Sequence, residues 1–247
     1  MSANVADAAI GLRIADRDSV RWITLSRPEV KNALNGSMLA GLVEAVDCDV
    51  AAIVITGEGS TFSSGLDLKA VTRGELPAHA LQDAIRAIRA ASVPTIAAVN
   101  GPAITAGMGL ALACDFAIAS DAAVFADSHG KIGVLSASGI TSLLVERIGS
   151  ARAKEMSLTA RLIDAQTAEA WGLVNTVVPS DQLESVIADR TRRIAAHSRP
   201  LMRAMVGVHA GLAEIVSGPR FALEASTSAE WAQNAGATIT WERPTLT

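Results

Sequence analysis

The chain has 247 residues, half of them hydrophobic and 19% charged, with a formal net charge of −4. This length supports one large core, so we expect a single domain over residues 1–247. The negative charge, the Arg residues spread along predicted helices, and the content of four Phe and no Tyr exclude a nucleic-acid partner.

Targeting features and cysteines limit the location of the protein. No apolar run reaches the roughly 18 residues of a membrane helix, so we expect no membrane partner. Residues 1–10 place no basic stretch before an apolar core, which indicates no secretory signal. Cys48 and Cys114 make no disulfide framework. A reducing cytoplasm is therefore the expected compartment.

The first quarter of the chain alternates strands with a helix. Strands are expected at 10–14 and 20–25, with a turn at 16–19. Apolar residues then recur at helical spacing over 33–46. A continuous apolar strand at 51–56 ends in a glycine-rich loop at 57–65, which is typical of a strand covered on both faces.

The next segment repeats this order. The pattern predicts a helix at 81–91, a buried strand at 94–99, a helix at 106–113 and a strand at 115–119. Such alternation favours parallel strands joined by crossover helices. After Ser150 the pattern is mainly helical, with helices expected at 151–158, 164–172, 182–195 and 199–215. We therefore expect an α/β core over about 1–180 and a helical region over about 181–247.

Two loops of small residues, 63–68 and 103–109, each join a buried strand to a helix. Small side chains let another group approach the backbone, and the first turn of a helix carries unpaired N–H groups and partial positive charge. Either loop alone is also explained by ordinary α/β packing. Neither contains the glycine pattern of a phosphate loop or of a dinucleotide-binding turn.

Taken together and in order, these motifs resemble the enoyl-CoA hydratase/isomerase (crotonase) family. The resemblance runs from about residue 12 to 179, and residues 235–247 match the family poorly. The matching segments are 26–28 with 32–35, 64–68, 97–103, 114–115, 125–127, 131–133, 149–159 and 168–179. The resemblance implies a crotonase-like spiral of repeated strand-strand-helix units, with a C-terminal helical region that serves trimer assembly.

The resemblance also implies a binding mode. The carbonyl oxygen of an acyl- or enoyl-CoA thioester would lie between the backbone N–H groups of Leu66 and Ala106, an oxyanion hole suited to reactions through a thioester enolate. Coenzyme A would be part of the substrate, with no other cofactor, and the assembly would be a homotrimer or homohexamer. The substrate and coenzyme A contacts implied are Ser64, Gly65, Asp67, Leu68, Lys69, Gly107 and Gly109. Lys31 and Arg27 are further candidates for the phosphates, although surface cations are usually only solvated.

In the hydratases of this family two Glu residues add water, and here they correspond to Gly109 and His129. Glycine transfers no proton, so efficient hydration is doubtful. Histidine titrates near neutral pH, and His129 could act as acid or base if Asp127 orients it. His129 could equally fill the space of a Glu, and Asp127 could be a capping residue. Ser136 and Ser138, where relatives carry a further acid, are expected to be structural.

Other chemistries find less support in the sequence. Ser63 or Ser64 with His129 would suggest a hydrolase triad, but the Gly-x-Ser-x-Gly motif is absent. The four His residues form no i, i+4 pair, so no metal site is expected. Three possibilities stay open: an enzyme that moves a proton or double bond beside the thioester, a non-catalytic acyl-CoA carrier or sensor, and a structural protein. The acyl chain length depends on the pocket wall at 69–91, whose sequence does not specify it.

Overall fold

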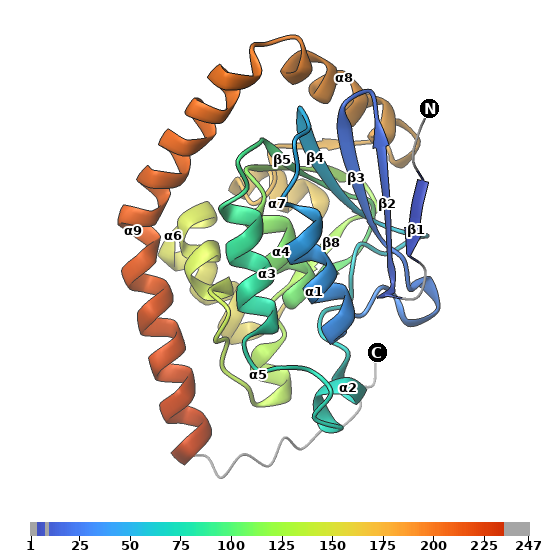
Figure 1. The fold of residues 1–247 in the computed structure, drawn as a ribbon. Coiled ribbons are helices and arrows are strands. Elements are labelled where there is room, and N and C mark those ends of the chain that lie inside the picture. The colour runs from blue at the N-terminus through green and yellow to red at the C-terminus, as the bar shows by residue number, and fades with distance from the viewer. Residues whose placement is uncertain (1–3, 8–9, 235–247) are drawn as a thin grey trace.

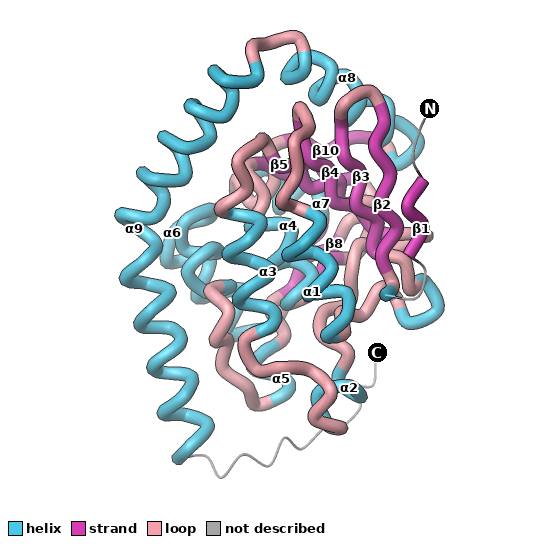
Figure 2. The backbone as a smooth tube through the Cα atoms, in the orientation of Figure 1, coloured by secondary structure: helices cyan, strands magenta, loops and turns pink. Residues whose placement is uncertain are grey.

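The computed structural model describes residues 4–7 and 10–234, which form two β-sheets and surrounding helices (Figure 1, Figure 2). The larger sheet has the order β1-β2-β3-β4-β5-β7-β10. Pairing is antiparallel from β1 to β3 and parallel from β3 to β10. Its strands are β1 (Asn4–Asp7), β2 (Leu12–Arg17), β3 (Val20–Leu25), β4 (Ala52–Gly57), β5 (Thr95–Val99), β7 (Phe116–Ser120) and β10 (Thr176–Val178).

The smaller sheet consists of short strands, and two of them each follow a main strand along the chain. It contains β6 (Ala103–Ile104), β8 (Val124–Ala126) and β9 (Ile163–Asp164). Parallel bridges pair Ser63 with Ala103 and Leu34 with Leu66, so segments after β3 and β4 join this layer. β5, β6 and helix α4 form one strand-strand-helix unit, and β7, β8 and helix α5 form the next. The predicted repeat is therefore present.

The helices cover both faces of the larger sheet. They are α1 (Gly36–Ala45), α2 (Leu68–Thr72), α3 (Ala80–Arg89), α4 (Ala106–Ala113), α5 (His129–Ile132), α6 (Ile140–Thr159), α7 (Ala165–Trp171), α8 (Leu183–Ala195) and α9 (Arg199–Asn234), with 3₁₀ turns at Pro28–Val30 and Ser180–Gln182. The main core lies between the sheet and α1, α3, α4 and α6. A smaller core joins α8 to the opposite face. Every residue of α4 is buried, which makes it the central helix.

Some element boundaries differ from the sequence prediction. The helix expected at 33–46 begins only at Gly36, because Leu34 pairs with Leu66 and the Asn35 side chain caps the first turn by accepting from Met38 N. The helix expected at 151–158 is the second half of α6, which Gly149, with a φ of 76° and a ψ of 163°, divides from an unpredicted first half. The helix expected at 199–215 continues to Asn234.

The C-terminal region is a long helix along one side of the molecule. α9 packs against α6 and runs past the helical layer toward the end of the molecule where α5 lies (Figure 1). Within the described ranges, no helix is both long and apolar enough to cross a membrane. Residues 235–247, the last part of the expected helical region, lie outside the described residues, as do residues 1–3 and 8–9.

Candidate functional site

Two asparagine side chains hydrogen-bond to the backbone of the loop after β4. Asn100 Oδ1 accepts from Gly57 N at 3.0 Å, and Asn100 Nδ2 donates to Gly59 O at 2.8 Å. The buried Asn32 donates through Nδ2 to Glu58 O at 3.0 Å and to Thr61 O at 2.7 Å. These side chains replace the backbone bonds that the loop does not make with itself, so its path is fixed.

At the end of this loop, the residues on either side of Leu66 hydrogen-bond to Leu34. In the parallel bridge between Leu34 and Leu66, Leu34 N donates to Gly65 O and Asp67 N donates to Leu34 O, both at 2.8 Å. The flanking residues therefore make the bridge bonds. Among the described residues no acceptor receives the Leu66 N–H. A backbone donor without an acceptor is rare in a folded protein unless it serves a ligand or water.

The second loop has a comparable donor at the start of α4. Thr105 precedes the helix with a φ of 50° and a ψ of −104°, a strained conformation for a β-branched residue. Its N–H donates to Ala126 O at 2.8 Å, and Gly109 N closes the first turn on Thr105 O at 2.9 Å. The Ala106 N–H donates to no acceptor among the described residues, as expected for the first turn of a helix. Strain at Thr105 thus immediately precedes a free donor.

The two donors lie on adjacent loops. Ser63 pairs with Ala103, and Ile104 N donates to Ser63 O at 2.9 Å. Gly65 has a φ of +100°, and a Cβ built on it would lie 3.1 Å from Ile104 O and 3.7 Å from Ala106 N. Gly107 faces Ser63 O, where a Cβ would lie at 2.4 Å. Glycine at these two positions lets the loops approach each other closely.

Gly109 faces apolar side chains. A Cβ built there would lie 2.8 Å from Ile140 Cγ1 and 3.4 Å from Ile85 Cδ1, and both isoleucines are fully buried. The direction in which a side chain at position 109 would point is therefore closed by the first residue of α6 and by α3. No room for a carboxylate exists in this direction without movement of Ile140.

His129 belongs to a three-residue polar network. Its Nδ1 lies 2.6 Å from Asp127 Oδ1, and Ser157 Oγ on α6 donates to Asp127 Oδ2 at 2.6 Å. Burial raises the pKa of Asp127, but the hydrogen bonds from His129 and Ser157 outweigh burial and hold that pKa below its usual range. Because the ionised carboxylate only accepts, Nδ1 carries a proton, and neutral His129 presents its lone pair on Nε2.

The pKa of Asp127 makes a pH-dependent contribution to stability. The pKa is lower in the folded state than in the unfolded chain, so this contribution is present above about pH 4 and is lost as the pH falls through the folded-state value. Asp127→Asn is expected to lower the free energy of unfolding by about 1–3 kcal/mol at pH 7. Urea titrations of both proteins at pH 7 and pH 3 would measure this difference in the free energy of unfolding, and Asp181→Asn, at an exposed position, serves as the control. A pH-independent difference would contradict this assignment.

The second loop and the histidine segment are tied together. Ser128 N donates to Thr105 Oγ1 at 3.0 Å, and the two hydroxyl oxygens lie 2.5 Å apart. The residue before Ala106 thus contacts the residue before His129. The parallel register of β6 and β8, which pairs Ile104 with Ala126, brings the two segments side by side.

The structure does not assemble the hydrolase triad. Ser63 is fully buried, and its hydroxyl donates to Asn32 O at 2.8 Å and accepts from Gly65 N at 3.2 Å. The Ser64 hydroxyl points to Val30 O at 3.5 Å, and the serine in the His129 network is Ser157. Within the described ranges no group of three or more His, Cys, Asp or Glu side chains could hold a metal ion.

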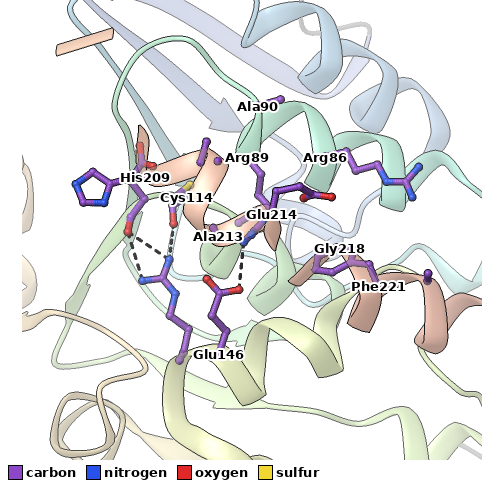
Figure 3. Close-up of a pocket in the computed structure, with 16 residues that line it drawn as sticks. Arg86, Arg89, Ala90, Cys114, Glu146, His209, Ala213, Glu214, Gly218 and Phe221 are labelled. Carbon is purple, nitrogen blue, oxygen red and sulfur yellow. Dashed lines mark hydrogen bonds and ion pairs between the residues drawn. The ribbon is translucent and has the colours of Figure 1, made fainter. Parts of the chain in front are cut away.

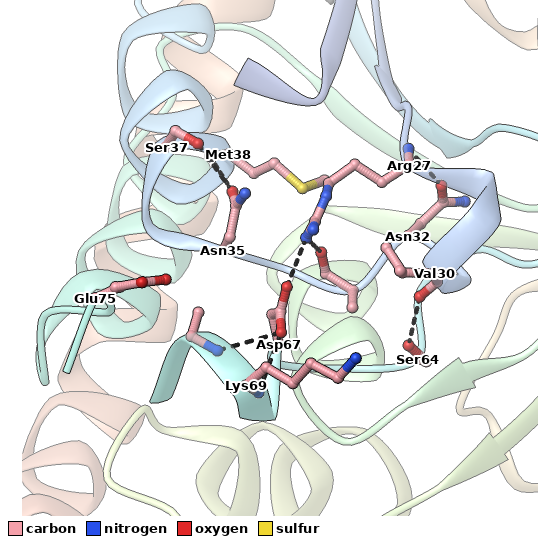
Figure 4. Close-up of polar contacts among 12 residues, drawn as sticks. Arg27, Val30, Asn32, Asn35, Ser37, Met38, Ser64, Asp67, Lys69 and Glu75 are labelled. Carbon is pink, nitrogen blue, oxygen red and sulfur yellow. Dashed lines mark hydrogen bonds and ion pairs between the residues drawn. The ribbon is translucent and has the colours of Figure 1, made fainter. Parts of the chain in front are cut away.

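Near α2, charged side chains form a partly buried cluster (Figure 4). Arg27 Nη1 donates to Asp67 Oδ2 at 3.0 Å and to Ala33 O at 2.7 Å. Asp67 also caps α2 by accepting from Lys69 N and Ala70 N. Burial raises the pKa of Asp67, but these hydrogen bonds lower it below its usual range. The Asp67 side chain therefore fixes the loop, while the exposed Lys69 is a candidate for an anionic ligand.

Three residues at or near the site were not predicted from the sequence. Thr105 is one of them, because nothing in the local sequence indicates that this β-branched residue before a helix has a strained backbone. Ser157 lies 30 positions from Asp127, and Glu224, on α9, bonds to Ser136 and to Ser142. No local pattern indicates such distant partners. Ser138 contributes only a backbone N–H, which donates to Ser136 Oγ at 3.4 Å.

A cavity of about 840 Å³ lies elsewhere, between α3, α6 and α9 (Figure 3). Two of the arginines that line it have partners: Arg89 bonds to Ser217 at 2.9 Å and lies 3.6 Å from Glu146, and Arg147 donates to Cys114 O at 2.6 Å. Neither of the two glycine-rich loops lines it. This cavity is therefore separate from the candidate site.

Comparisons with known proteins agree with these observations. The sequence profile described as enoyl-CoA hydratase/isomerase matches residues 15–216. The chain is 35% identical over 199 residues to 4-chlorobenzoyl coenzyme A dehalogenase-1 of an Arthrobacter species, covering 75% of this chain and 72% of the relative.

Solved structures support the same fold. The enoyl-CoA hydratase of Mycobacterium tuberculosis H37Rv is 32% identical, with a TM-score of 0.81 over 90% of this chain and 99% of that one. A monofunctional enoyl CoA isomerase of M. smegmatis is 35% identical, with a TM-score of 0.71 over 83% and 94%. The predicted crotonase-like α/β fold with a C-terminal helical region is confirmed.

Proposed function

Because the chain belongs to the enoyl-CoA hydratase/isomerase family, we propose that it binds an acyl- or enoyl-CoA thioester, with the carbonyl oxygen between the N–H groups of Leu66 and Ala106. The observation that carries this proposal is the pair of backbone donors on adjacent loops that have no acceptor among the residues the structure describes. Coenzyme A enters as part of the substrate, and Lys69 is proposed to meet its phosphates.

This arrangement suits chemistry through an enolate. Removing a proton beside a thioester carbonyl moves negative charge onto the carbonyl oxygen. Preorganised donors aimed at that oxygen stabilise the charge, and removing one such donor typically costs about 3 kcal/mol. The α4 N-terminus adds partial positive charge on the same side.

His129 is the proposed acid and base of such a reaction. Asp127 accepts from Nδ1, which leaves Nε2 to take up and return a proton. A double-bond shift, or another proton transfer next to the thioester, needs one such group. Adding water efficiently needs a second one, and the Gly109 direction that would hold it is closed by Ile140.

The names of the relatives support the ligand class rather than one reaction. They describe a dehalogenase, a hydratase and an isomerase, and all three names include coenzyme A. The common element is the thioester carrier. We propose for this chain the same class of ligand, with the reaction set by His129.

A second function is favoured by Gly109. The loops would still bind the thioester in a non-catalytic carrier or sensor of acyl-CoA, and the apolar contact with Ile140 would replace the lost carboxylate. The two proposals differ in turnover and agree on binding. A protein with neither binding nor turnover would be a structural member of the family.

The deciding experiment combines two measurements on one preparation: calorimetric binding of acetoacetyl-CoA, a mimic of a thioester enolate, and steady-state hydration of crotonyl-CoA. We expect tight binding with little or no hydration. A double-bond shift in a 3-enoyl-CoA would then separate the enzyme from the carrier. Absence of acetoacetyl-CoA binding would contradict both, and rapid hydration would show that one protein base suffices.

Assembly is proposed to use α9. Five apolar side chains recur at spacings of four and three along it, and each is between 47% and 75% exposed: Leu201, Met205, Val208, Leu212 and Ile215. Such a stripe fits a homotrimer or homohexamer built through region 181–247. Sedimentation equilibrium is expected to give three or six times the chain mass, and a monomer at micromolar concentration would contradict this assembly.

The compartment proposed is a reducing cytoplasm, because Cys48 and Cys114 are both free thiols. Fractionation of the native cells, with immunodetection of the protein, tests this location. Recovery in an extracellular fraction would contradict it.

A further inference from the structure

The far half of α9 presents four residues along one face to segment 133–142. Phe221, Glu224, Ser228 and Trp231 are spaced by three, four and three positions, the repeat of one helical face. Trp231 Nε1 donates to Gly133 O at 3.4 Å, and Ser228 Oγ donates to Leu135 O at 3.1 Å. The Phe221 ring lies on Gly139, where a Cβ would be only 1.9 Å from Cε1. The contacts therefore follow the segment in order.

Glu224 makes the densest contact of this face. Its Oε1 accepts from Ser136 Oγ and from Gly139 N at 3.0 Å, with a longer bond of 3.4 Å from Thr141 N. Its Oε2 accepts from both the N–H and the hydroxyl of Ser142, each at 3.0 Å. Five donors thus converge on one carboxylate.

This carboxylate replaces a missing cap. α6 begins after Gly139, which has a left-handed backbone and no side chain to cap the helix. Glu224 satisfies the first-turn N–H groups of Thr141 and Ser142 from 83 and 82 positions away in the sequence, and its charge complements the helix dipole. A carboxylate offers about four lone-pair directions, so five donors leave none aimed at a ligand. The geometry is that of a cap and not of a base.

The capped segment connects two parts of the candidate site. At its start, Val134 N donates to His129 O at 3.2 Å, closing the turn that carries the histidine. At its end, Ile140 packs against Gly109 on the central helix. Movement of segment 133–142 would therefore shift both the His129 turn and the apolar wall at Gly109.

We propose that Glu224 is a positioning residue of the thioester site: by capping α6 it fixes segment 133–142, and the docking of α9 thereby sets the wall that faces the acyl group. This inference rests on the proposed function. It assigns Glu224 no contact with the reacting atoms.

The test compares Glu224→Gln with Glu230→Gln, an exposed residue of the same helix to which the described structure gives no polar contact. The amide NH₂ that replaces one oxygen donates instead of accepting, so it opposes the donors of the capped turn. Amide hydrogen exchange in segment 133–142 should become roughly tenfold to a hundredfold faster, as expected for losing one hydrogen bond to a charged group. Exchange in β4 should not change in either variant.

Ligand binding then tests whether segment 133–142 affects the thioester site. Glu224→Gln should weaken the binding of acetoacetyl-CoA more than the binding of free coenzyme A, because only acetoacetyl-CoA carries an acyl group. Glu230→Gln should bind both ligands like wild type. Ser142→Ala, which removes one donor, should show a smaller effect in the same direction. It replaces Glu224→Gln if that variant does not fold.

The outcomes separate two kinds of failure. Wild type that does not bind acetoacetyl-CoA would refute the proposed function. Wild type that binds, with unchanged exchange in Glu224→Gln, would refute the cap. Faster amide exchange in Glu224→Gln, with an unchanged ratio of the affinities for acetoacetyl-CoA and free coenzyme A, would refute the link between the capped segment and the thioester site.

Discussion

His129→Ala is expected to lower the turnover of an enoyl-CoA at least about a hundredfold, the usual contribution of a general acid or base. Binding of acetoacetyl-CoA should be retained, because the proposed oxyanion hole consists of backbone N–H groups of other residues. The physical reason is specific to the geometry: Asp127 fixes the ring, and Nε2 is its only nitrogen free to exchange a proton. Steady-state rates and calorimetry on the same preparation measure the two effects.

A matched control is His197→Ala, since His197 is an exposed histidine in the turn between α8 and α9, outside both loops and outside segment 69–91. It should turn over like wild type. Unchanged turnover in His129→Ala would remove the histidine from the reaction. It would leave the carrier function, or a substrate that brings its own acid or base, as the account of the site.

Gly109→Glu is expected to destabilise the protein by more than about 3 kcal/mol, because a carboxylate would enter a buried apolar space without a partner. Introducing the carboxylate that the family resemblance predicts for a hydratase at this position should therefore not confer hydration. Ile140 and Ile85 occupy the direction of the side chain. Chemical unfolding gives the loss of stability, and crotonyl-CoA hydration gives the activity.

Two further variants test whether contact with the isoleucines causes the loss of stability in Gly109→Glu. Gly109→Ala should cost much less than Gly109→Glu, because it adds one apolar methyl group, whose 2.8 Å contact requires only Ile140 to shift, and because alanine favours a helix by about 1 kcal/mol over glycine. In Gly109→Glu/Ile140→Ala, the smaller side chain should recover part of the lost stability. A stable and active Gly109→Glu single variant would mean that the space beside α4 is larger than the packing indicates.

Much of the fold follows from local sequence. The apolar run at 51–56 and the small residues at 106–113 predict β4 and α4 to within one residue, because a buried strand and a buried helix each need a continuous apolar segment. The glycine-rich loops are also visible, since close approach of two backbones requires glycine at Gly65 and Gly107.

The long C-terminal helix could not be predicted in the same way. Ser217, Gly218 and Pro219 are typical of a helix end, yet α9 continues through them. What extends the helix is tertiary: Ser217 binds Arg89, and Phe221 packs on Gly139. Contacts with residues distant in sequence outweigh the local preference.

The first half of α6 was missed for a related reason. Its cap is the carboxylate of Glu224, so the sequence before Ile140 shows no Ser, Thr, Asp or Asn at the capping position. The partner of Asp127 was equally hidden, because Ser157 reaches it from α6. In both cases the deciding contact joins residues far apart in the chain, and local patterns carry no information about it.

The most direct test of the central claim is the infrared stretching frequency of a ¹³C-labelled thioester carbonyl in bound crotonyl-CoA. Two N–H donors, from Leu66 and Ala106, should shift this band below its position in water. In Gly65→Ala the left-handed φ of +100° and the 3.1 Å approach of the added Cβ to Ile104 O would displace the two loops, so the shift should shrink. A bound thioester whose carbonyl absorbs as it does in water would contradict the proposed oxyanion hole.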